Sequence, residues 1–94
     1  MGLHYAYSPQ EARLELALDG DLDLTLTPRL MEAIKFIDAR LRSCIIDTSE
    51  VQREFDSGIA LMSLLIDRLA RYEINTELRG PRWGRQASAL SQVL

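Results

Sequence analysis

The chain has 94 residues, a length that suits one small domain, residues 1–94, and is too short for two. Its hydrophobic fraction of 47% and charged fraction of 27% are typical of a globular protein with a core. A net charge of −3 argues against nonspecific binding to nucleic acid, and no apolar run approaches the ~18 residues of a membrane span. We therefore expect a cytoplasmic protein that binds no nucleic acid and does not insert into a membrane.

Cysteine and histidine are too scarce for the common metal and redox sites. Cys44, the single cysteine, lies in an apolar run, so we expect a reduced thiol in the core. His4 has no nearby nucleophile motif and no Cys/His cluster, which argues against a catalytic triad or a zinc site. Asp19, Asp21 and Asp23 lack the later glutamate of an EF-hand loop, so we expect a solvated turn there. The sequence therefore predicts no enzyme, no cofactor and no metal.

Hydrophobic alternation predicts two strands at the start of the chain, over residues 3–7 and 13–18. A break is expected at residues 19–21. Residues 22–26 then form either an extension of the strand or an extended approach to a helix. The periodic apolar residues predict that helix over 28–42.

The ends of this first helix have recognisable signals. Thr27 is predicted as its N-cap, and Pro28 suits the first helical position. Arg40 and Arg42 are expected in the last turn, where cations favour the negative end of the helix dipole.

The second half of the chain continues this alternation of strands and helices. Residues 43–47 predict a central strand buried on both faces, and residues 48–55 a connecting loop. A second helix is expected from Ser57 or Gly58 to about Tyr72. A strand over 74–78 and a short final helix over 83–94 follow. This order predicts an α/β fold, a mixed β-sheet of about four to five strands with helices packed against it.

The segment from Phe55 to Gly58 lies between the central strand and the second helix, a place where α/β folds often carry recognition sites. Asp56 is expected to cap the helix, a role that contributes about 1 kcal/mol. Gly58 permits either close packing of the helix on a strand or the approach of a partner to the backbone. Phe55 suits either the core or an aromatic anchor for a partner.

Four segments together resemble a known family. Residues 14–23 are similar to its early strand and the turn after it, and residues 45–51 to its central strand. Residues 58–61 are similar to the opening of its second helix, and residues 75–80 to its late strand. The family is the STAS domain family, the fold of bacterial anti-sigma factor antagonists.

The resemblance implies a non-enzymatic protein-interaction module for transcription regulation, which binds a kinase-type anti-sigma factor through residues 48–61. The partner-binding residues that it implies are Thr48, Ser49, Phe55, Asp56, Ser57 and Gly58. An alternative is a cytoplasmic STAS accessory subunit of a lipid-transporting ABC system, in which the same segment contacts the ATPase subunit.

Two alignments to the family's phosphorylated motif remain open. Without gaps, Asp56 takes the position of the phosphorylated hydroxyl residue and Ser57 that of the second hydroxyl. With a shift of one residue, Asp56 takes the preceding aspartate position and Ser57 becomes the phosphoacceptor. We favour the alignment without gaps, in which a fixed carboxylate replaces the switch residue.

Overall fold

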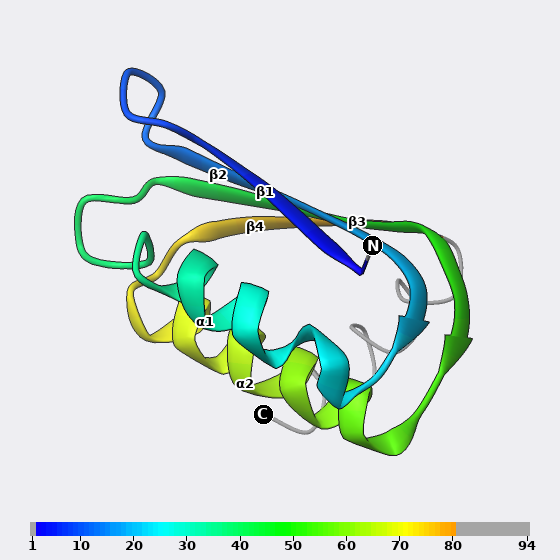
Figure 1. Cartoon of the computed structure of the whole chain (residues 1–94). Coiled ribbons are helices and arrows are strands. Elements are labelled where there is room, and N and C mark those ends of the chain that lie inside the picture. Colours follow the sequence, from blue (N-terminus) through cyan, green and yellow to red (C-terminus); the bar gives the residue numbers. More distant parts are fainter. Residues whose placement is uncertain (1, 81–94) are drawn as a thin grey trace.

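Seven elements follow one another along residues 2–80, the part of the chain that the computed structural model describes (Figure 1). They are β1 (Leu3–Ser8), β2 (Arg13–Leu22), the 3-10 helix η1 (Leu24–Leu26), α1 (Thr27–Ile34), β3 (Ser43–Glu54), α2 (Asp56–Arg71) and β4 (Asn75–Arg79). The helix expected over 83–94 lies outside the described residues.

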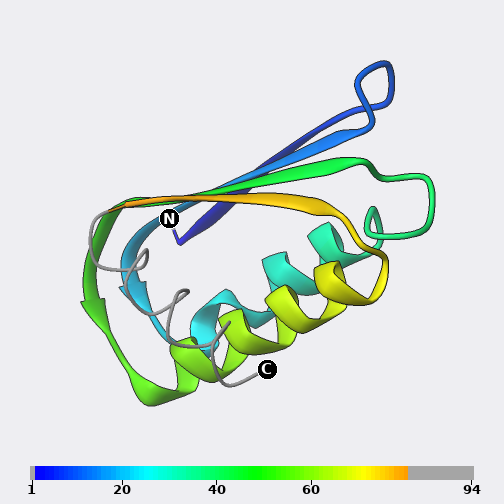
Figure 2. The same cartoon turned by 180° about the vertical axis from the view of Figure 1, so that it is seen from behind.

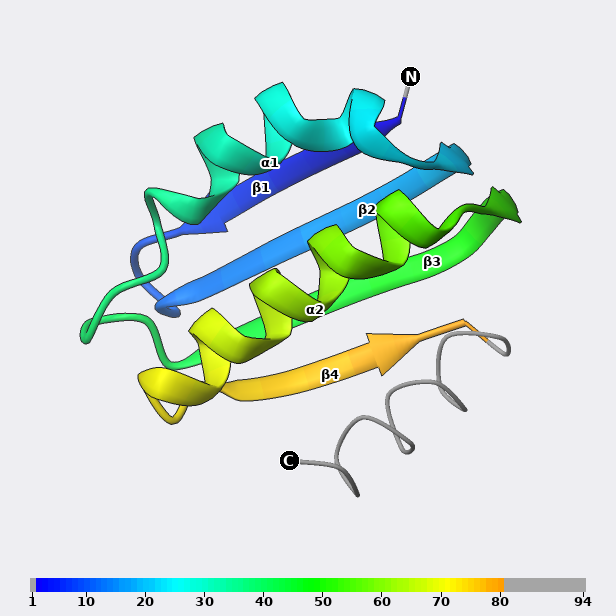
Figure 3. The same ribbon diagram turned by 90° about the horizontal axis from the view of Figure 1, so that it is seen from below.

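The four strands form one mixed sheet in the order β1-β2-β3-β4. β1 and β2 form an antiparallel hairpin, while β2, β3 and β4 run parallel to one another. Both helices lie on the same face of the sheet, α1 along β1 and α2 along β2 and β3 (Figure 3). The predicted mixed sheet with packed helices is therefore confirmed.

The core lies between the sheet and the two helices. Alternate residues of the strands point into it, because successive side chains of a strand face opposite sides. The fully buried strand residues include Leu14, Leu16, Cys44 and Ile46, and α2 contributes Met62, Leu65 and Leu69. The predicted core position of Cys44 is confirmed, and burial raises the pKa of its thiol to about 12.

The loop predicted over 48–55 is wrong, because β3 continues to Glu54. The break predicted at 19–21 is also wrong, since β2 passes through Gly20, which adopts a φ of +70°. Residues 19–22 of β2 pair with residues 50–54 of β3, and the register of this pairing is irregular beside residues 19 and 20. At such bulges a strand bends, and both strands curve toward the helix starts at their far ends (Figure 2).

The helix predicted over 28–42 ends at Ile34. Asp38 accepts hydrogen bonds from the backbone N–H and the guanidinium of Arg40, at 2.9 and 2.8 Å. This local turn replaces further helix, because short polar side chains that bond nearby backbone compete with helical bonding. Arg40 and Arg42 therefore lie outside the helix, contrary to the prediction.

The start of α1 also differs from the prediction. Thr27 is the first helical residue and not the N-cap, and its hydroxyl donates to the Leu24 carbonyl at 2.7 Å. A 3-10 turn precedes α1, and the Asp23 carboxylate caps it by accepting from the Thr25 N–H at 2.9 Å. Pro28 is the second residue of α1, one position later than predicted, and still lies in the first turn.

Residues 43–47 of β3 are buried on one face and not on both. Cys44 and Ile46 face the helices, whereas Ile45 and Asp47 are half-buried. The opposite face of the sheet has an open depression of about 320 Å³, whose lining includes Ala6, Ala17 and Ile45.

Candidate functional site

The segment between β3 and α2 consists of Phe55 alone, and both backbone groups of this residue are bonded. Its N–H donates to the Leu22 carbonyl and its own carbonyl accepts from the Ile59 N–H, both at 3.0 Å. With φ −117° and ψ 152°, Phe55 is the extended N-cap residue of α2. The start of the helix therefore has a fixed position relative to the end of β2.

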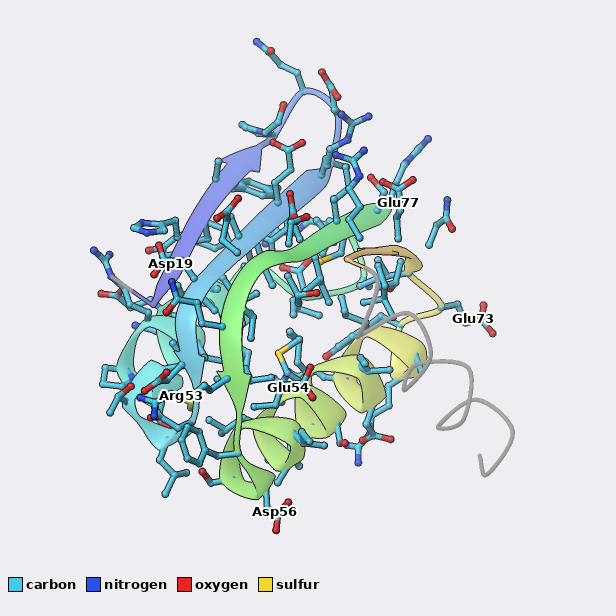
Figure 4. All side chains as sticks on the ribbon, turned by 90° about the vertical axis from the view of Figure 1, so that its right-hand side faces the viewer. Asp19, Arg53, Glu54, Asp56, Glu73 and Glu77 are labelled. Atoms are coloured by element: carbon cyan, nitrogen blue, oxygen red, sulfur yellow. The ribbon has the colours of Figure 1, made fainter. Side chains whose placement is uncertain are left out.

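Asp56 is the first residue of α2 and is exposed to solvent. The prediction that it caps the helix is wrong, because the cap position belongs to Phe55 and no side chain bonds there. Figure 4 shows Asp56 at the start of α2, with its carboxylate directed away from the ribbon. A negative charge in the first turn is favoured by the positive end of the helix dipole.

Ser57 is the second residue of α2 and is half-buried. The first N–H groups of a helix have no acceptor within the helix, and they favour an anion at this position. The fold therefore tolerates a hydroxyl, a carboxylate or a phosphate at residues 56 and 57.

Gly58 is buried where α2 crosses the end of β2. A β-carbon at this position would lie 2.7 Å from the backbone nitrogen of Asp23 and closer still to Leu22. Of the two roles that the sequence left open for Gly58, the structure supports close packing of the helix on the strand.

Thr48 and Ser49 lie in the middle of β3 and not in a loop. Thr48 is buried, and its hydroxyl donates to the Arg79 carbonyl at 3.0 Å, which links β3 to the end of β4. Ser49 is exposed, and its N–H donates to the Asp47 carboxylate at 2.9 Å. Six residues of strand lie between Thr48 and Phe55, which places the two about 20 Å apart along the strand. The structure therefore brings Phe55, Asp56 and Ser57 together, but not Thr48 and Ser49 with them.

Sequence reasoning missed the side chain that lies against Phe55. The guanidinium of Arg53 lies 5.7 Å from the centre of the Phe55 ring, a cation–π distance. It also donates two hydrogen bonds to Asp21, at 3.1 and 3.0 Å, and these raise the pKa of Arg53. No local pattern predicts this arrangement, because it depends on the register that places residue 53 beside residue 21.

The three aspartates at the end of β2 each have a partner. Asp19 accepts from the N–H of Gly2 at 2.6 Å and contacts the ring of His4 at 3.0 Å. The bond from Gly2 makes the largest contribution to lowering the pKa of Asp19. Asp21 bonds Arg53, and Asp23 caps η1.

Neither a metal-binding cluster nor a membrane-spanning helix is found in the part of the chain that the structure describes. In residues 2–80, no group of three or more His, Cys, Asp or Glu side chains could hold a metal ion. None of the helices in that range is long and apolar enough to cross a membrane.

Comparison with known proteins gives matches in structure only. No protein-family model matches the sequence, and no curated protein does. The anti-sigma factor antagonist SpoIIAA in its unphosphorylated form superposes with a TM-score of 0.69 at 14% identity, over 98% of this chain and 97% of that one. The STAS domain of an anti-sigma factor antagonist from Rhodobacter sphaeroides gives a TM-score of 0.61 at 15% identity, over 84% of this chain and 85% of that one.

A larger protein contains a similar unit. Mglu matches with a TM-score of 0.69 at 19% identity, over 84% of this chain, but the chain spans only 19% of the length of Mglu. The matches that cover most of both chains are instead to anti-sigma factor antagonists. The described part of this chain therefore has a STAS-like fold.

Proposed function

We propose that this chain is a cytoplasmic, non-enzymatic interaction module of the anti-sigma factor antagonist type, and that residues 1–94 form a single domain. In this proposal it binds a kinase-type anti-sigma factor through the surface around the start of α2. Its regulatory role is in bacterial transcription. The support is a STAS-like fold together with its superposition on anti-sigma factor antagonists along nearly their whole length.

The exposed first turn of α2 carries the proposal. Asp56 and Ser57 follow the N-cap of a helix whose start is fixed by a hydrogen bond from Phe55 to β2. A rigid, solvent-accessible turn of this kind can be recognised by another protein without any rearrangement of the backbone. We assign the contact to Phe55, Asp56 and Ser57, with Gly58 as the packing residue beneath them. Thr48 does not contact the partner in this proposal. It is buried, and it supports the sheet by linking β3 to β4.

The charge at this turn determines its regulation in the proposal. In the shifted alignment, a phosphate on Ser57 would add nearly two negative charges and three acceptor oxygens. The start of the helix accommodates this charge, so the fold is not disrupted. The phosphate would instead lower the affinity of the partner, whose surface would meet a dianion in place of a neutral hydroxyl. In the alignment without gaps, which we favour, Asp56 instead supplies a permanent single charge as a fixed substitute for the phosphorylated residue.

Calorimetric titration of the full chain with the kinase-type anti-sigma factors of the same genome tests the proposal. We expect one of them to bind, and Asp56→Asn to change its Kd by at least about tenfold, the effect typical of a central interface residue. Glu73→Gln is the matched control, because Glu73 is an exposed carboxylate at the opposite end of α2 (Figure 4). The Glu73→Gln variant should bind the anti-sigma factor with the same Kd as the wild type.

The same titration includes the ATPase subunits of lipid-transporting ABC systems. Binding to such a subunit, with no binding to any anti-sigma factor, would refute the proposal and support the alternative that the sequence left open. A folded chain that binds neither class would refute both.

A further inference from the structure

Two large apolar side chains are exposed on neighbouring segments at the far end of the sheet. Leu24 of η1 is 62% exposed and Phe55 is 42% exposed. Their segments touch through the backbone, since Phe55 bonds the Leu22 carbonyl and a β-carbon on Gly58 would meet Asp23. Exposed apolar residues on a rigid backbone are suitable anchors for a partner, because little conformational entropy is lost on binding.

The ring of Phe55 is supported from one side by a fixed cation. Arg53 lies against the ring, and the two hydrogen bonds that its guanidinium donates to Asp21 orient it. Because Asp21 neutralises Arg53, this cation adds little net positive charge to the surface. Arg53 is therefore a positioning residue for the Phe55 side chain.

An acidic groove lies next to Leu24, since its lining includes the neighbouring residues Asp23 and Thr25. It has a volume of about 850 Å³, and its charged lining residues are four carboxylates and one cation: Asp19, Asp21, Asp23, Glu50 and Arg29. The two segments 21–24 and 50–57 together carry five carboxylates and one guanidinium. The surface therefore combines two exposed apolar side chains, Leu24 and Phe55, with neighbouring segments that carry a net negative charge.

We propose that Leu24, Phe55 and the acidic groove form a docking surface for a basic, amphipathic segment of a protein partner. The apolar side chains of that segment pack on Leu24 and Phe55, and its lysines and arginines lie over the carboxylates of the groove. The inference deepens the proposed function and rests on it, because it states which partner chemistry fits the start of α2.

The charge of the surface argues against the other occupants. A second copy of the chain in a two-fold arrangement would bring the same five carboxylates to the interface, and like charges in contact oppose association. An anionic membrane surface would be repelled for the same reason. Only a cationic partner gains from both components of the surface.

Titration of the 15N-labelled full chain with a helical peptide of leucine and lysine tests the inference directly, with a leucine–glutamate peptide of the same length as the control. We expect the lysine peptide to shift the amide signals of residues 21–24 and 53–57, and the glutamate peptide to leave them unchanged. Increasing the salt from about 0.05 M to about 0.5 M should weaken binding at least about tenfold, because salt screens exposed charges.

Leu24→Ser and Phe55→Ser should each weaken binding of the lysine peptide at least about tenfold. Leu64→Ser is the matched control, since Leu64 is 65% exposed on α2 but lies outside this surface. Arg53→Gln tests positioning. It should weaken binding while thermal unfolding and the far-UV spectrum stay unchanged, and Arg53→Lys should restore part of the affinity.

The outcomes separate the inference from the proposed function. No binding of the lysine peptide, binding elsewhere on the chain, or equal effects of Leu24→Ser and Leu64→Ser would overturn the inference. An anti-sigma factor that binds the wild type and Leu24→Ser equally would also overturn it while the proposed function stands. A lysine peptide that maps to this surface, with no anti-sigma factor binding, would refute the proposed function alone.

Discussion

Gly58 packs so closely on Leu22 that a β-carbon at residue 58 would overlap the Leu22 carbonyl oxygen. The same oxygen accepts the hydrogen bond from Phe55, so the end of β2 determines the position of the exposed turn. Any side chain at residue 58 must displace α2 from the sheet. The site thus depends on a residue that does not itself reach the surface.

Gly58→Ala should therefore destabilise the protein by about 3 kcal/mol, at the upper end of the cost of overpacking, and Gly58→Leu by more. Urea unfolding followed by circular dichroism measures the loss. Ser57→Ala is the control, because it removes only a hydroxyl from a half-buried position, and it should change stability by less than about 0.5 kcal/mol. Equal stability of the two alanine variants would contradict the close contact.

Phosphorylation discriminates between the two alignments of residues 55–58. In the alignment without gaps, the anti-sigma kinase should not phosphorylate the wild type, because Asp56 occupies the acceptor position and has no hydroxyl. Asp56→Ser should then accept phosphate, as measured by intact-mass spectrometry. Phosphate on the wild type that disappears in Ser57→Ala would instead support the shifted alignment.

The thiol of Cys44 should not react in the folded protein. With its pKa raised to about 12 by burial, only about one part in ten thousand is thiolate at pH 8. We expect iodoacetamide to leave the native chain unmodified for hours and to add one group in concentrated urea, as detected by mass spectrometry. Rapid labelling without denaturant would show that Cys44 is accessible.

Acid should destabilise the fold through Asp47. The hydroxyl and the N–H of Ser49 bond this carboxylate and lower its pKa below 3.8. A lowered folded-state pKa stabilises the protein above the unfolded-state value, and that contribution is lost as the pH falls from about 4 through the lowered pKa. Asp47→Asn should therefore show a smaller loss of unfolding free energy between about pH 5 and pH 2 than the wild type. Identical acid profiles would contradict this role.

Local pattern was sufficient for much of this fold. The alternation over 13–18 predicts which side chains of β2 are buried, and the apolar spacing after Gly58 predicts α2 to within two residues at each end. These features depend on neighbours a few residues apart, which the sequence displays directly. The placement of Asp56 and Ser57 at the start of a helix was predictable for the same reason.

The rest depends on contacts between segments far apart in the chain. Residues 48–54 show no alternation, yet they form strand because the end of β2 pairs with them. That pairing also places Arg53 beside Asp21 and against Phe55. The sequence by itself thus determined the elements and the acidic turn. The tertiary structure alone decided what surrounds that turn, since hydrogen bonds between strands align residues about 30 positions apart, beyond the reach of any local pattern.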